Sequence, residues 1–292
     1  MIQSQKSFEK GLSSGILYLI PTPIGNLEDM TFRAIRLMKE VSLIAAEDTR
    51  NTKKLCNHFG IDTPLTSYHD HNKEIAGAKL IDHLQQGLDV AIVSDAGLPC
   101  ISDPGAEIVR EAVAAGFTVV PIPGANAALT ALIASTLPTE SFTFYGFLPR
   151  NKKERRKELE RIYFHDATLL FYEAPHRLKE TLKDVLDVLG PNRKITLARE
   201  LTKKFEEFLR GTVEEAFDWA SSEEIRGEFV MVIEGSHEME ARVEPWEMLS
   251  VKEHIEYIMK EQEVSSKEAI KEVSKARNIP KREVYEAFHI SE

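Results

Sequence analysis

The chain has 292 residues, of which 42% are hydrophobic and 29% are charged, and its formal net charge is −10. A chain of this length exceeds what one hydrophobic core usually organises, so two domains followed by a tail are expected. The excess of acidic residues argues against a protein that coats nucleic acid non-specifically, because such binding depends on phosphate neutralisation by Lys and Arg.

Three features bear on where the protein works. Its longest apolar runs, such as Ile16–Ile20, are far shorter than the roughly 20 residues of a membrane span. The N-terminus is polar and lacks the apolar stretch of a secretory signal. The only cysteines are Cys56 and Cys100, which suits a reducing compartment. We therefore expect a cytoplasmic protein with no membrane segment.

From Ile16 onward, short apolar strands alternate with segments of helical period, which is typical of an α/β domain with a largely parallel sheet. The predicted strands are Ile16–Ile20, Leu43–Ala46, Val90–Val93 and Thr118–Ile122. The first domain is expected to span residues 14–123.

Beyond Pro138 the strands become richer in β-branched and aromatic residues, which favours a second α/β domain with more antiparallel pairing. The predicted strands are Thr168–Tyr172, Lys194–Ala198, Phe205–Arg210 and Glu228–Ile233. A helix is predicted over Leu178–Leu189, where Gly190-Pro191 stops it. This domain is expected to span residues 124–235.

Residues 236–292 form a tail that is rich in Glu and Lys and carries no strand pattern. Apolar residues mark short helices, the last two separated by Asn278-Ile279-Pro280. The spacing is compatible with a helix-turn-helix unit. A small helical appendage that packs on the body or on a second subunit is the favoured interpretation, because the local net charge is below zero.

Three loops rich in small residues follow predicted strands of the first domain: Pro21–Asn26, Ser94–Gly105 and Pro121–Ala128. Ligands of open α/β sheets bind at the carboxyl ends of strands, and small side chains let a ligand approach the main chain. Asp103 and Pro104 are predicted to be the N-cap and first residue of the next helix. No glycine-rich dinucleotide motif or phosphate loop is present, so a cofactor is held by another device.

Seven motifs in order carry a resemblance to a known family. They are Leu19–Leu27, Ala45–Arg50, Ser67–Asn72, Ser94–Gly105, Gly146–Arg150, Phe171–Arg177 and Ala198–Lys203. They resemble the tetrapyrrole methylase superfamily, in particular the branch that 2′-O-methylates a cytidine in small-subunit ribosomal RNA. The resemblance covers Leu17–Gly235, and the tail is similar to that branch's C-terminal extension.

The resemblance implies two α/β domains with an active-site cleft between them, a homodimer, and S-adenosylmethionine as the cofactor, held mostly by main chain. Carried over by position, the cofactor-binding residues are Pro23, Ser94, Asp95, Ala96, Gly97, Pro99, Ala127 and Ala128 from the first domain and Tyr172, Glu173 and Leu201 from the second. Many relatives carry Gly-Asp-Pro where this chain has Ser94-Asp95-Ala96, so the turn differs there.

A ribose 2′-OH is a poor nucleophile, so its methylation needs in-line positioning and a group that takes up the proton. One carboxylate among Asp48, Glu173 and Glu200 is predicted to accept that proton. Arg50, Arg177 or Arg199 would hold phosphate through bidentate hydrogen bonds. The alternative is that these carboxylates and arginines pair with one another between the domains, and the sequence favours neither.

The expected partner is 16S ribosomal RNA within the small ribosomal subunit. The residues predicted to contact it are Arg50, Lys53, Lys54, Arg150, Lys152, Lys153, Arg155, Arg156, Arg177 and Arg199. Within Arg150–Arg161, seven basic and three acidic residues give a local net charge of +4. The alternative for this segment is a solvated helix with ion pairs four residues apart.

Two other functions are alternatives to methylation of ribosomal RNA. Relatives methylate corrin or sirohaem precursors, but such a macrocycle needs an open apolar trough, whereas the basic clusters suit a phosphate backbone. The other rival is a non-catalytic RNA-binding assembly factor. No metal is predicted, because the pair His69 and His71 has no cysteine partner and methyl transfer from a sulfonium needs no Lewis acid.

Overall fold

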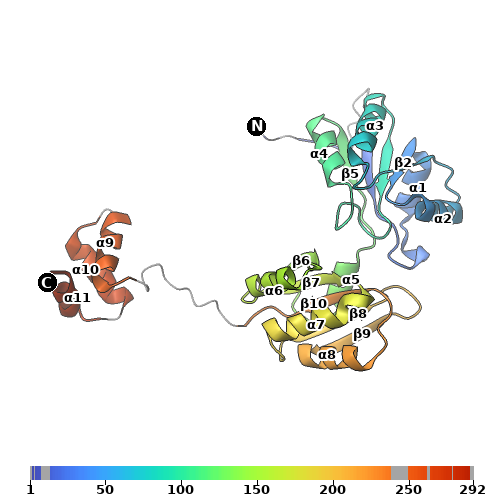
Figure 1. The fold of residues 1–292 in the computed structure, drawn as a ribbon. Coiled ribbons are helices and arrows are strands. Elements are labelled where there is room, and N and C mark those ends of the chain that lie inside the picture. Colours follow the sequence, from blue (N-terminus) through green and yellow to red (C-terminus); the bar gives the residue numbers. More distant parts are fainter. Residues whose placement is uncertain are drawn as a thin grey trace. The chain divides into compact units, whose positions relative to one another are not determined.

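The structure is a computed structural model that describes residues 2, 4–7, 14–237, 249–261, 264–277 and 279–289. The chain divides into two compact units, Met1–His237 and Glu238–Glu292. The first unit contains two sheets and the second is helical (Figure 1).

The first sheet has five parallel strands in the order β3-β2-β4-β1-β5. These are β1 (Ile16–Ile20), β2 (Leu43–Ala46), β3 (Leu65–Ser67), β4 (Val90–Val93) and β5 (Thr118–Pro121). The structure confirms the predicted parallel sheet and its four predicted strands, although β5 ends one residue early. The short edge strand β3 was not predicted.

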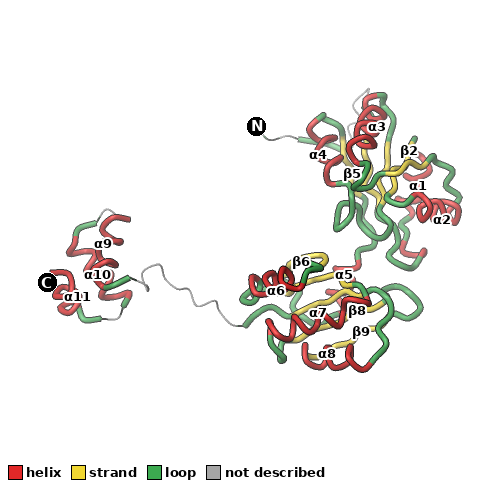
Figure 2. Tube along the Cα trace, in the orientation of Figure 1, coloured by secondary structure: helices red, strands yellow, loops and turns green. Residues whose placement is uncertain are grey.

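Helices cover both faces of this sheet (Figure 2). On one face, α1 (Phe32–Glu40) and α2 (Thr49–Phe59) pack against the strands. On the other face lie α3 (Lys73–Gln85) and α4 (Ala106–Ala114). A short 3-10 helix, η1 (Leu27–Asp29), follows β1. Because both faces are buried, the central strands are continuous apolar runs, and every residue of β4 is buried.

The second sheet has the order β6-β7-β10-β8-β9. Its strands are β6 (Phe142–Phe147), β7 (Thr168–Glu173), β8 (Lys194–Arg199), β9 (Glu207–Thr212) and β10 (Phe229–Ile233). Strands β6 and β7 are parallel and the other three pairs are antiparallel, which confirms the prediction of more antiparallel pairing. Strand β9 begins two residues later than predicted, because the preceding residues form a turn in which Glu206 N–H donates to the Lys203 carbonyl.

Four helices flank the second sheet. Helix α5 (Ala127–Ala134) packs on one face. On the other face lie α6 (Lys152–Arg161), α7 (Pro175–Leu189) and α8 (Val213–Ser222). Helix α7 ends before Gly190 as predicted, but it begins three residues before the predicted start, with a proline in its first turn.

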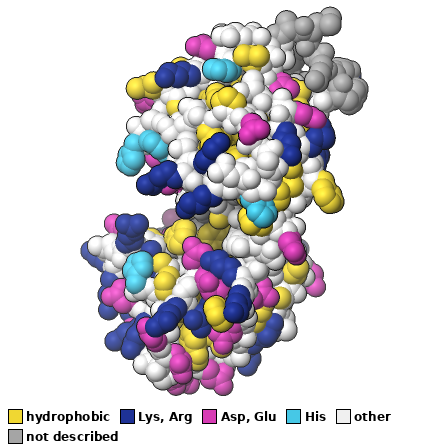
Figure 3. Space-filling model, turned by 90° about the vertical axis from the view of Figure 1, so that its right-hand side faces the viewer, with side chains coloured by type: hydrophobic (Ala, Val, Ile, Leu, Met, Phe, Trp, Pro, Cys, Tyr) yellow, Lys and Arg dark blue, Asp and Glu magenta, His cyan; other side chains and the backbone are white. Residues whose placement is uncertain are grey.

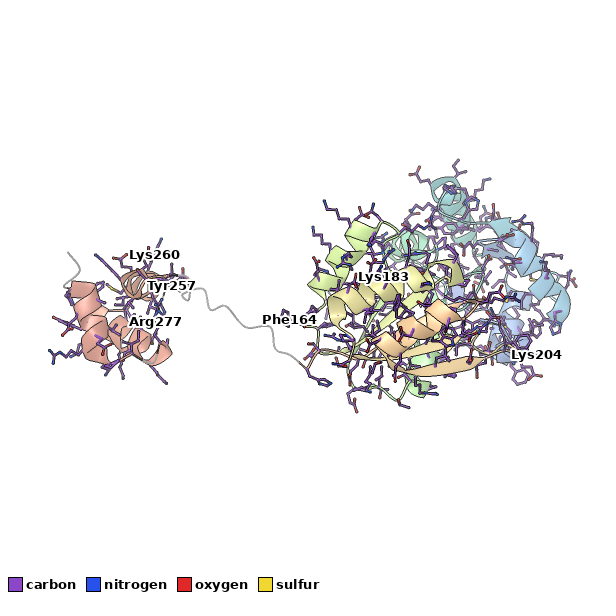
Figure 4. The ribbon with its side chains drawn as sticks, turned by 60° about the horizontal axis from the view of Figure 1, so that its bottom comes forward. Phe164, Lys183, Lys204, Tyr257, Lys260 and Arg277 are labelled. Atoms are coloured by element: carbon purple, nitrogen blue, oxygen red, sulfur yellow. The ribbon has the colours of Figure 1, made fainter. Side chains whose placement is uncertain are left out.

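The C-terminal unit contains α9 (Val251–Glu261), α10 (Ser266–Ala276) and α11 (Lys281–His289) around a small apolar core. The Arg277 side chain (Figure 4) donates to His254 Nδ1 at 3.1 Å and to the Leu249 carbonyl, which ties the end of α10 to the start of α9. Asn278, part of the predicted break between helices, lies outside the described residues. Within the described ranges, no helix combines the length and apolarity needed to cross a bilayer.

Candidate cofactor and substrate site

A cavity of about 320 Å³ lies within the first unit. The loops after β1, β2, β4 and β5 contribute one part of its lining, namely Ile24, Glu47, Asp95–Leu98, Ile101–Asp103, Asn126 and Ala127. The second sheet and its connections contribute Phe147, Tyr172–Ala174, Ala198, Glu200, Leu201, Lys203 and Glu228–Val230. The predicted loops at the strand ends therefore meet around one space.

The loop after β4 has an uncommon backbone. Gly97, Cys100, Ser102 and Gly105 have φ angles of 79°, 70°, 61° and 134°. For residues other than glycine such conformations cost about 1–3 kcal/mol each and cluster at functional sites. Thr22 and Gly97 exchange two main-chain hydrogen bonds of 2.9 and 3.0 Å, which join the loop after β1 to the loop after β4.

Contacts between loops also bring the two sheets together. A Cβ on Gly25 would lie 2.6 Å from Lys203 Cγ and 2.9 Å from the Thr202 hydroxyl oxygen, so only glycine lets these loops approach so closely. Ile24, next to it, packs against the apolar cluster of the second sheet. The loop after β1 therefore helps to close the cavity.

Asp103 differs from its prediction. Helix α4 begins at Ala106 with Gly105 as its N-cap, so Asp103 does not cap it, and that prediction is wrong. The half-buried Asp103 instead borders the cavity. Burial, together with the nearby carboxylates of Glu47 and Asp95, raises the pKa of Asp103 to about 7.

Glu47 and Asp95 complete a group of three carboxylates. Burial and the charge of Asp95 raise the pKa of Glu47. Asp95 accepts hydrogen bonds from the Asp48 main-chain N–H at 3.2 Å and from the Asn51 amide at 3.1 Å. Within the part of the chain that the structure describes, none of the three makes an ion pair, so no Lys or Arg side chain offsets their negative charge directly.

A second cavity of about 250 Å³ adjoins the first at Asp95, which borders both. Part of its lining is one face of α2, formed by Asn51, Thr52, Lys54, Leu55 and His58. The rest is Thr22, Pro23, Gly25, Leu27 and Ser94. The hydrogen-bonded pair of Thr22 and Gly97 connects the linings of the two cavities, since Thr22 borders the second and Gly97 the first.

The structure places the predicted cofactor residues in three groups. Seven border the larger cavity: Asp95, Ala96, Gly97, Ala127, Tyr172, Glu173 and Leu201. Pro23 and Ser94 border the smaller one. Pro99 and Ala128 are buried and border neither, and for Ala128 the reason is that α5 turns this residue toward the second sheet.

The predicted proton acceptors are engaged elsewhere, which corrects the prediction for Asp48 and Glu173. Asp48 caps α2 and borders neither cavity, and hydrogen bonds from Arg50 lower its pKa to about 2. The buried Glu173 carboxylate accepts hydrogen bonds from Ala174 N–H at 2.9 Å and from the Thr181 hydroxyl at 2.7 Å. Both of its oxygens are therefore engaged in holding the start of α7.

Glu200 borders the cavity but is also a poor base. Its carboxylate accepts hydrogen bonds from Lys203 Nζ at 2.9 Å and from Glu228 N–H at 3.1 Å. Although burial favours the neutral acid, these hydrogen bonds outweigh it and lower the pKa of Glu200. These charged residues do pair, but with near neighbours in their own domain, such as Asp48 with Arg50 and Glu173 with Arg177, so the alternative of pairing between the domains is wrong as well.

Three arginines predicted to contact RNA need the same correction. Arg155 is buried and its Nη2 lies 2.7 Å from an Asp184 oxygen. Arg177 donates to the Leu148 and Pro149 carbonyls, and Arg199 donates to the Arg226 carbonyl and to Glu207. Each of these side chains already donates hydrogen bonds inside the protein, which counts against all three as phosphate contacts.

The other predicted RNA contacts remain at the surface. Arg50, Lys53 and Lys54 lie on α2, and Arg150, Lys152 and Lys153 lie at the start of α6, all exposed. Arg50 pairs with Asp48, and Arg156 is one-third exposed and pairs with Asp184 and Asp187. On the face in Figure 3, basic and acidic side chains are interspersed, so any phosphate contact is local.

Sequence reasoning missed two site carboxylates, Glu47 and Asp103. Glu47 directly follows β2, so its position at a strand's carboxyl end was a usable signal. The Asp-Pro pair at 103 and 104 suggested a helix cap, and nothing in the sequence indicated the left-handed backbone of Cys100 and Ser102 that shapes this loop.

Comparison with known proteins identifies the class. Residues 16–216 match the family described as Tetrapyrrole (Corrin/Porphyrin) Methylases, and the chain belongs to this family. It is 58% identical over 294 aligned positions to the Ribosomal RNA small subunit methyltransferase I of Bacillus subtilis, covering 100% of both chains. The protein of that name from Halalkalibacterium halodurans is 57% identical over 292 positions, covering 99% of both.

Solved structures share the fold. Uroporphyrin-III C-methyl transferase from Thermus thermophilus, complexed with S-adenosyl homocysteine, has a TM-score of 0.53 at 20% identity, covering 75% of this chain and 97% of that one. A cobalt precorrin-4 methyltransferase has a TM-score of 0.58 at 15% identity, covering 75% and 94%. These similarities confirm the predicted tetrapyrrole methylase-like fold, which has two sheets, each flanked by helices.

Proposed function

We propose that this protein transfers the methyl group of S-adenosylmethionine to the ribose 2′-oxygen of a cytidine in 16S ribosomal RNA of the small ribosomal subunit. The observation that carries the proposal is the full-length similarity to relatives named Ribosomal RNA small subunit methyltransferase I. A cavity lined by the loops that carry the motif resemblance supports it. The choice of a cytidine 2′-oxygen follows from the motif resemblance.

The larger cavity fits the cofactor. Much of its lining is main chain or small and apolar side chains, among them Ile24, Ala96, Gly97, Ala127 and Leu201. Its carboxylates suit a ligand that carries a sulfonium and an ammonium group. Its volume of about 320 Å³ lies within the range of small-molecule sites. When bound, S-adenosylmethionine supplies an electrophilic methyl group.

Several residues of the chain position the reactants. Gly97 brings its main chain to the wall of the cavity, and Tyr172 hydrogen-bonds to the Ala128 main chain, which fixes the opposite wall to α5. Asp95, held by two donors, lies where the two cavities adjoin. Rigid walls of this kind keep the methyl donor and the acceptor in line, which is where most of the rate is gained when the nucleophile is weak.

We place the ribose of the acceptor where the two cavities adjoin at Asp95, whose charge also acts on Asp103, and the nucleobase and phosphate in the smaller cavity. Its apolar lining from Pro23, Leu27 and Leu55 suits a nucleobase, and Lys54 and His58 suit its phosphate. The proposal adds further phosphate contacts at Lys53 on the same helix and, separately, at Arg150, Lys152 and Lys153 around the start of α6, all of which are exposed. A protein with a net charge of −10 then binds RNA through these local groups and not through its overall field.

The proposal includes a homodimer, a cytoplasmic location and a reaction without a metal. Exposed apolar side chains on α5, Leu129 at 46% and Ile133 at 79%, support association of two copies. The location follows from the substrate, because small ribosomal subunits are assembled in the cytoplasm. Methyl transfer from a sulfonium needs no Lewis acid.

One assay tests the proposal. The protein is incubated with methyl-labelled S-adenosylmethionine and either immature small ribosomal subunits or a uroporphyrinogen. We expect label in 16S RNA, and after alkaline hydrolysis we expect it in a dinucleotide that resists cleavage, since a 2′-O-methyl group blocks attack by the ribose oxygen. Label in a base would overturn the assignment of the ribose 2′-oxygen as the methyl acceptor. Label in the tetrapyrrole alone would overturn the assignment of RNA as the substrate.

A further inference from the structure

The carboxylates around the larger cavity differ in how fully they are engaged. Glu173, Glu200 and Asp95 accept hydrogen bonds from named donors, and Lys203 pairs with Glu228. Glu47 accepts a hydrogen bond from the Asp95 main-chain N–H. Among the described residues, Asp103 alone of these carboxylates accepts no hydrogen bond and makes no ion pair. A half-buried polar group at a cavity wall without a partner calls for an explanation.

Burial raises the pKa of Asp103, and the charges of Glu47 and Asp95 raise it further. Four titratable groups face Asp103. Glu47 comes from the end of β2, Asp95 from the end of β4 and Tyr172 from β7, while Cys100 lies on its own loop. In the described chain, no Lys or Arg compensates these charges at Asp103. In this arrangement of the loop, Cys100 and Ser102 have positive φ angles, and such a backbone conformation lowers the stability of the protein.

We propose that Asp103 is the catalytic residue that accepts the proton of the acceptor hydroxyl during methyl transfer, an inference that rests on the proposed function. In this step the O–H bond of the ribose 2′-hydroxyl breaks and its proton passes to a carboxylate oxygen of Asp103. The 2′-oxygen forms a bond to the methyl carbon, and the carbon–sulfur bond breaks with its electron pair remaining on sulfur. Asp103 then releases the proton to solvent.

Its electrostatic setting suits Asp103 to this task. A general base works best when its pKa lies near the operating pH, and the pKa of Asp103 is about 7, whereas that of Asp48 is about 2. A cation in the cavity lowers the pKa of Asp103, because an opposite charge favours the carboxylate. Asp103 is therefore ionised at neutral pH while a cationic ligand is present, and it holds a proton more tightly once that positive charge has gone.

Two substitutions and one control test this role. Single-turnover methylation of immature small subunits is measured from pH 5.5 to 9 for the wild type, Asp103→Asn, Asp103→Glu and the exposed control Asp62→Asn. We expect Asp103→Asn to lower the rate by on the order of 10²- to 10⁴-fold and to remove the pH dependence. Asp103→Glu keeps a base and retains a pH-dependent part of the rate, and Asp62→Asn behaves as the wild type.

A second readout does not depend on catalysis. Binding of S-adenosylmethionine and of S-adenosylhomocysteine is measured by calorimetry at pH 7 in two buffers of different ionisation enthalpy. The wild type is expected to release more protons with the cationic ligand than with the neutral one, and Asp103→Asn is expected to lose this difference. The release reports ionisation of Asp103 itself, which a role confined to folding would not produce.

The outcomes separate the two proposals. Wild-type transfer to RNA together with a full rate for Asp103→Asn would overturn the role of Asp103 and leave the proposed function intact. Absence of transfer to RNA by the wild type would overturn the proposed function and the base role with it. If Asp103→Asn does not fold, a pH profile of Asp103→Glu that matches the wild type in both rate and midpoint overturns the assignment, because a longer carboxylate must shift one of them.

Discussion

Gly97 combines two demands at one position. Its φ of 79° lies in the left-handed region, and its α-carbon stands at the cavity wall, where a Cβ would lie 3.4 Å from Ile24 Cγ2 and 3.5 Å from the Ala125 carbonyl oxygen. Glycine meets the first demand because it has no Cβ to clash with the following carbonyl. It meets the second by leaving the cavity open to a ligand beside the main chain.

These two demands can be separated by substitution. Gly116, after α4, has a φ of 83°, and a Cβ there would meet no atom within 4 Å. We expect Gly97→Ala and Gly116→Ala each to lower the free energy of unfolding by about 1–2 kcal/mol, the cost of a left-handed alanine. Only Gly97→Ala should also weaken cofactor binding, by about tenfold or more in calorimetry. Equal cofactor affinity in both variants would contradict the placement of the cofactor at Gly97.

At the scale of residues, the sequence located most of the predicted cofactor residues at one cavity but did not point to Asp103. The loop Ser94–Gly105 was predicted because small residues after a buried strand indicate a ligand loop, and Asp95, Ala96 and Gly97 within it were taken from the family resemblance. The proton acceptor was sought among carboxylates near basic residues, but such neighbours lower a carboxyl pKa and engage its oxygens, as at Glu200. Among the described carboxylates of the cavity, Asp103 is distinguished by lacking both an ion pair and a hydrogen-bond donor, which depends on three-dimensional packing and cannot be predicted from the sequence.

At the scale of elements, burial on both faces made the central strands predictable. Strand β4 is an unbroken apolar run and was predicted without error, whereas β3 has only three half-buried residues and no recognisable pattern. The charged helix α6 was harder. Arg155 precedes the buried Leu159 by four residues and therefore lies on the same face of the helix. This spacing indicated that Arg155 is buried, but the prediction of an RNA contact considered only the number of basic residues.

The pair of Arg155 and Asp184 joins α6 to α7 and should govern the stability of this side of the second sheet. Both side chains are 1% exposed, and Arg155 Nε donates to Asp184 at 2.8 Å. Removing one partner leaves a buried charge, so we expect Asp184→Ala to lower the free energy of unfolding in urea by about 3–5 kcal/mol.

The exposed pair of Arg161 and Glu158 on the same helix provides a control, because surface ion pairs contribute little. Arg161→Ala should leave the urea midpoint almost unchanged. Arg155→Met combined with Asp184→Leu should recover most of the loss from Asp184→Ala, since it removes both charges and keeps apolar volume. A small effect of Asp184→Ala alone would mean that the pair is not buried in solution.

At the scale of the molecule, the larger cavity is a product of topology. The order β3-β2-β4-β1-β5 makes β1 and β4 neighbours although about 70 residues separate them, and this lets Thr22 bond to Gly97. The contact of Gly25 with Lys203 then adds the second sheet. Each loop was visible in the sequence, but their meeting could be expected only from the family resemblance, because strand order is not encoded in the residues of any one loop.

All residues that line the two cavities precede residue 231, and the first unit ends at His237. That unit contains its own hydrophobic cores and all of the residues that line the cavities. A chain that ends at His237 should therefore bind S-adenosylmethionine with an affinity within about threefold of that of the full chain. A difference of that size is smaller than the 1.4 kcal/mol that corresponds to a tenfold change. Calorimetry on both chains measures this, with Gly97→Ala in the shortened chain as the control for specific binding. A loss of tenfold or more on shortening would show that Glu238–Glu292 supplies part of the cofactor site. Unchanged affinity with reduced methylation of small subunits would instead assign the C-terminal helices to the RNA side of the reaction.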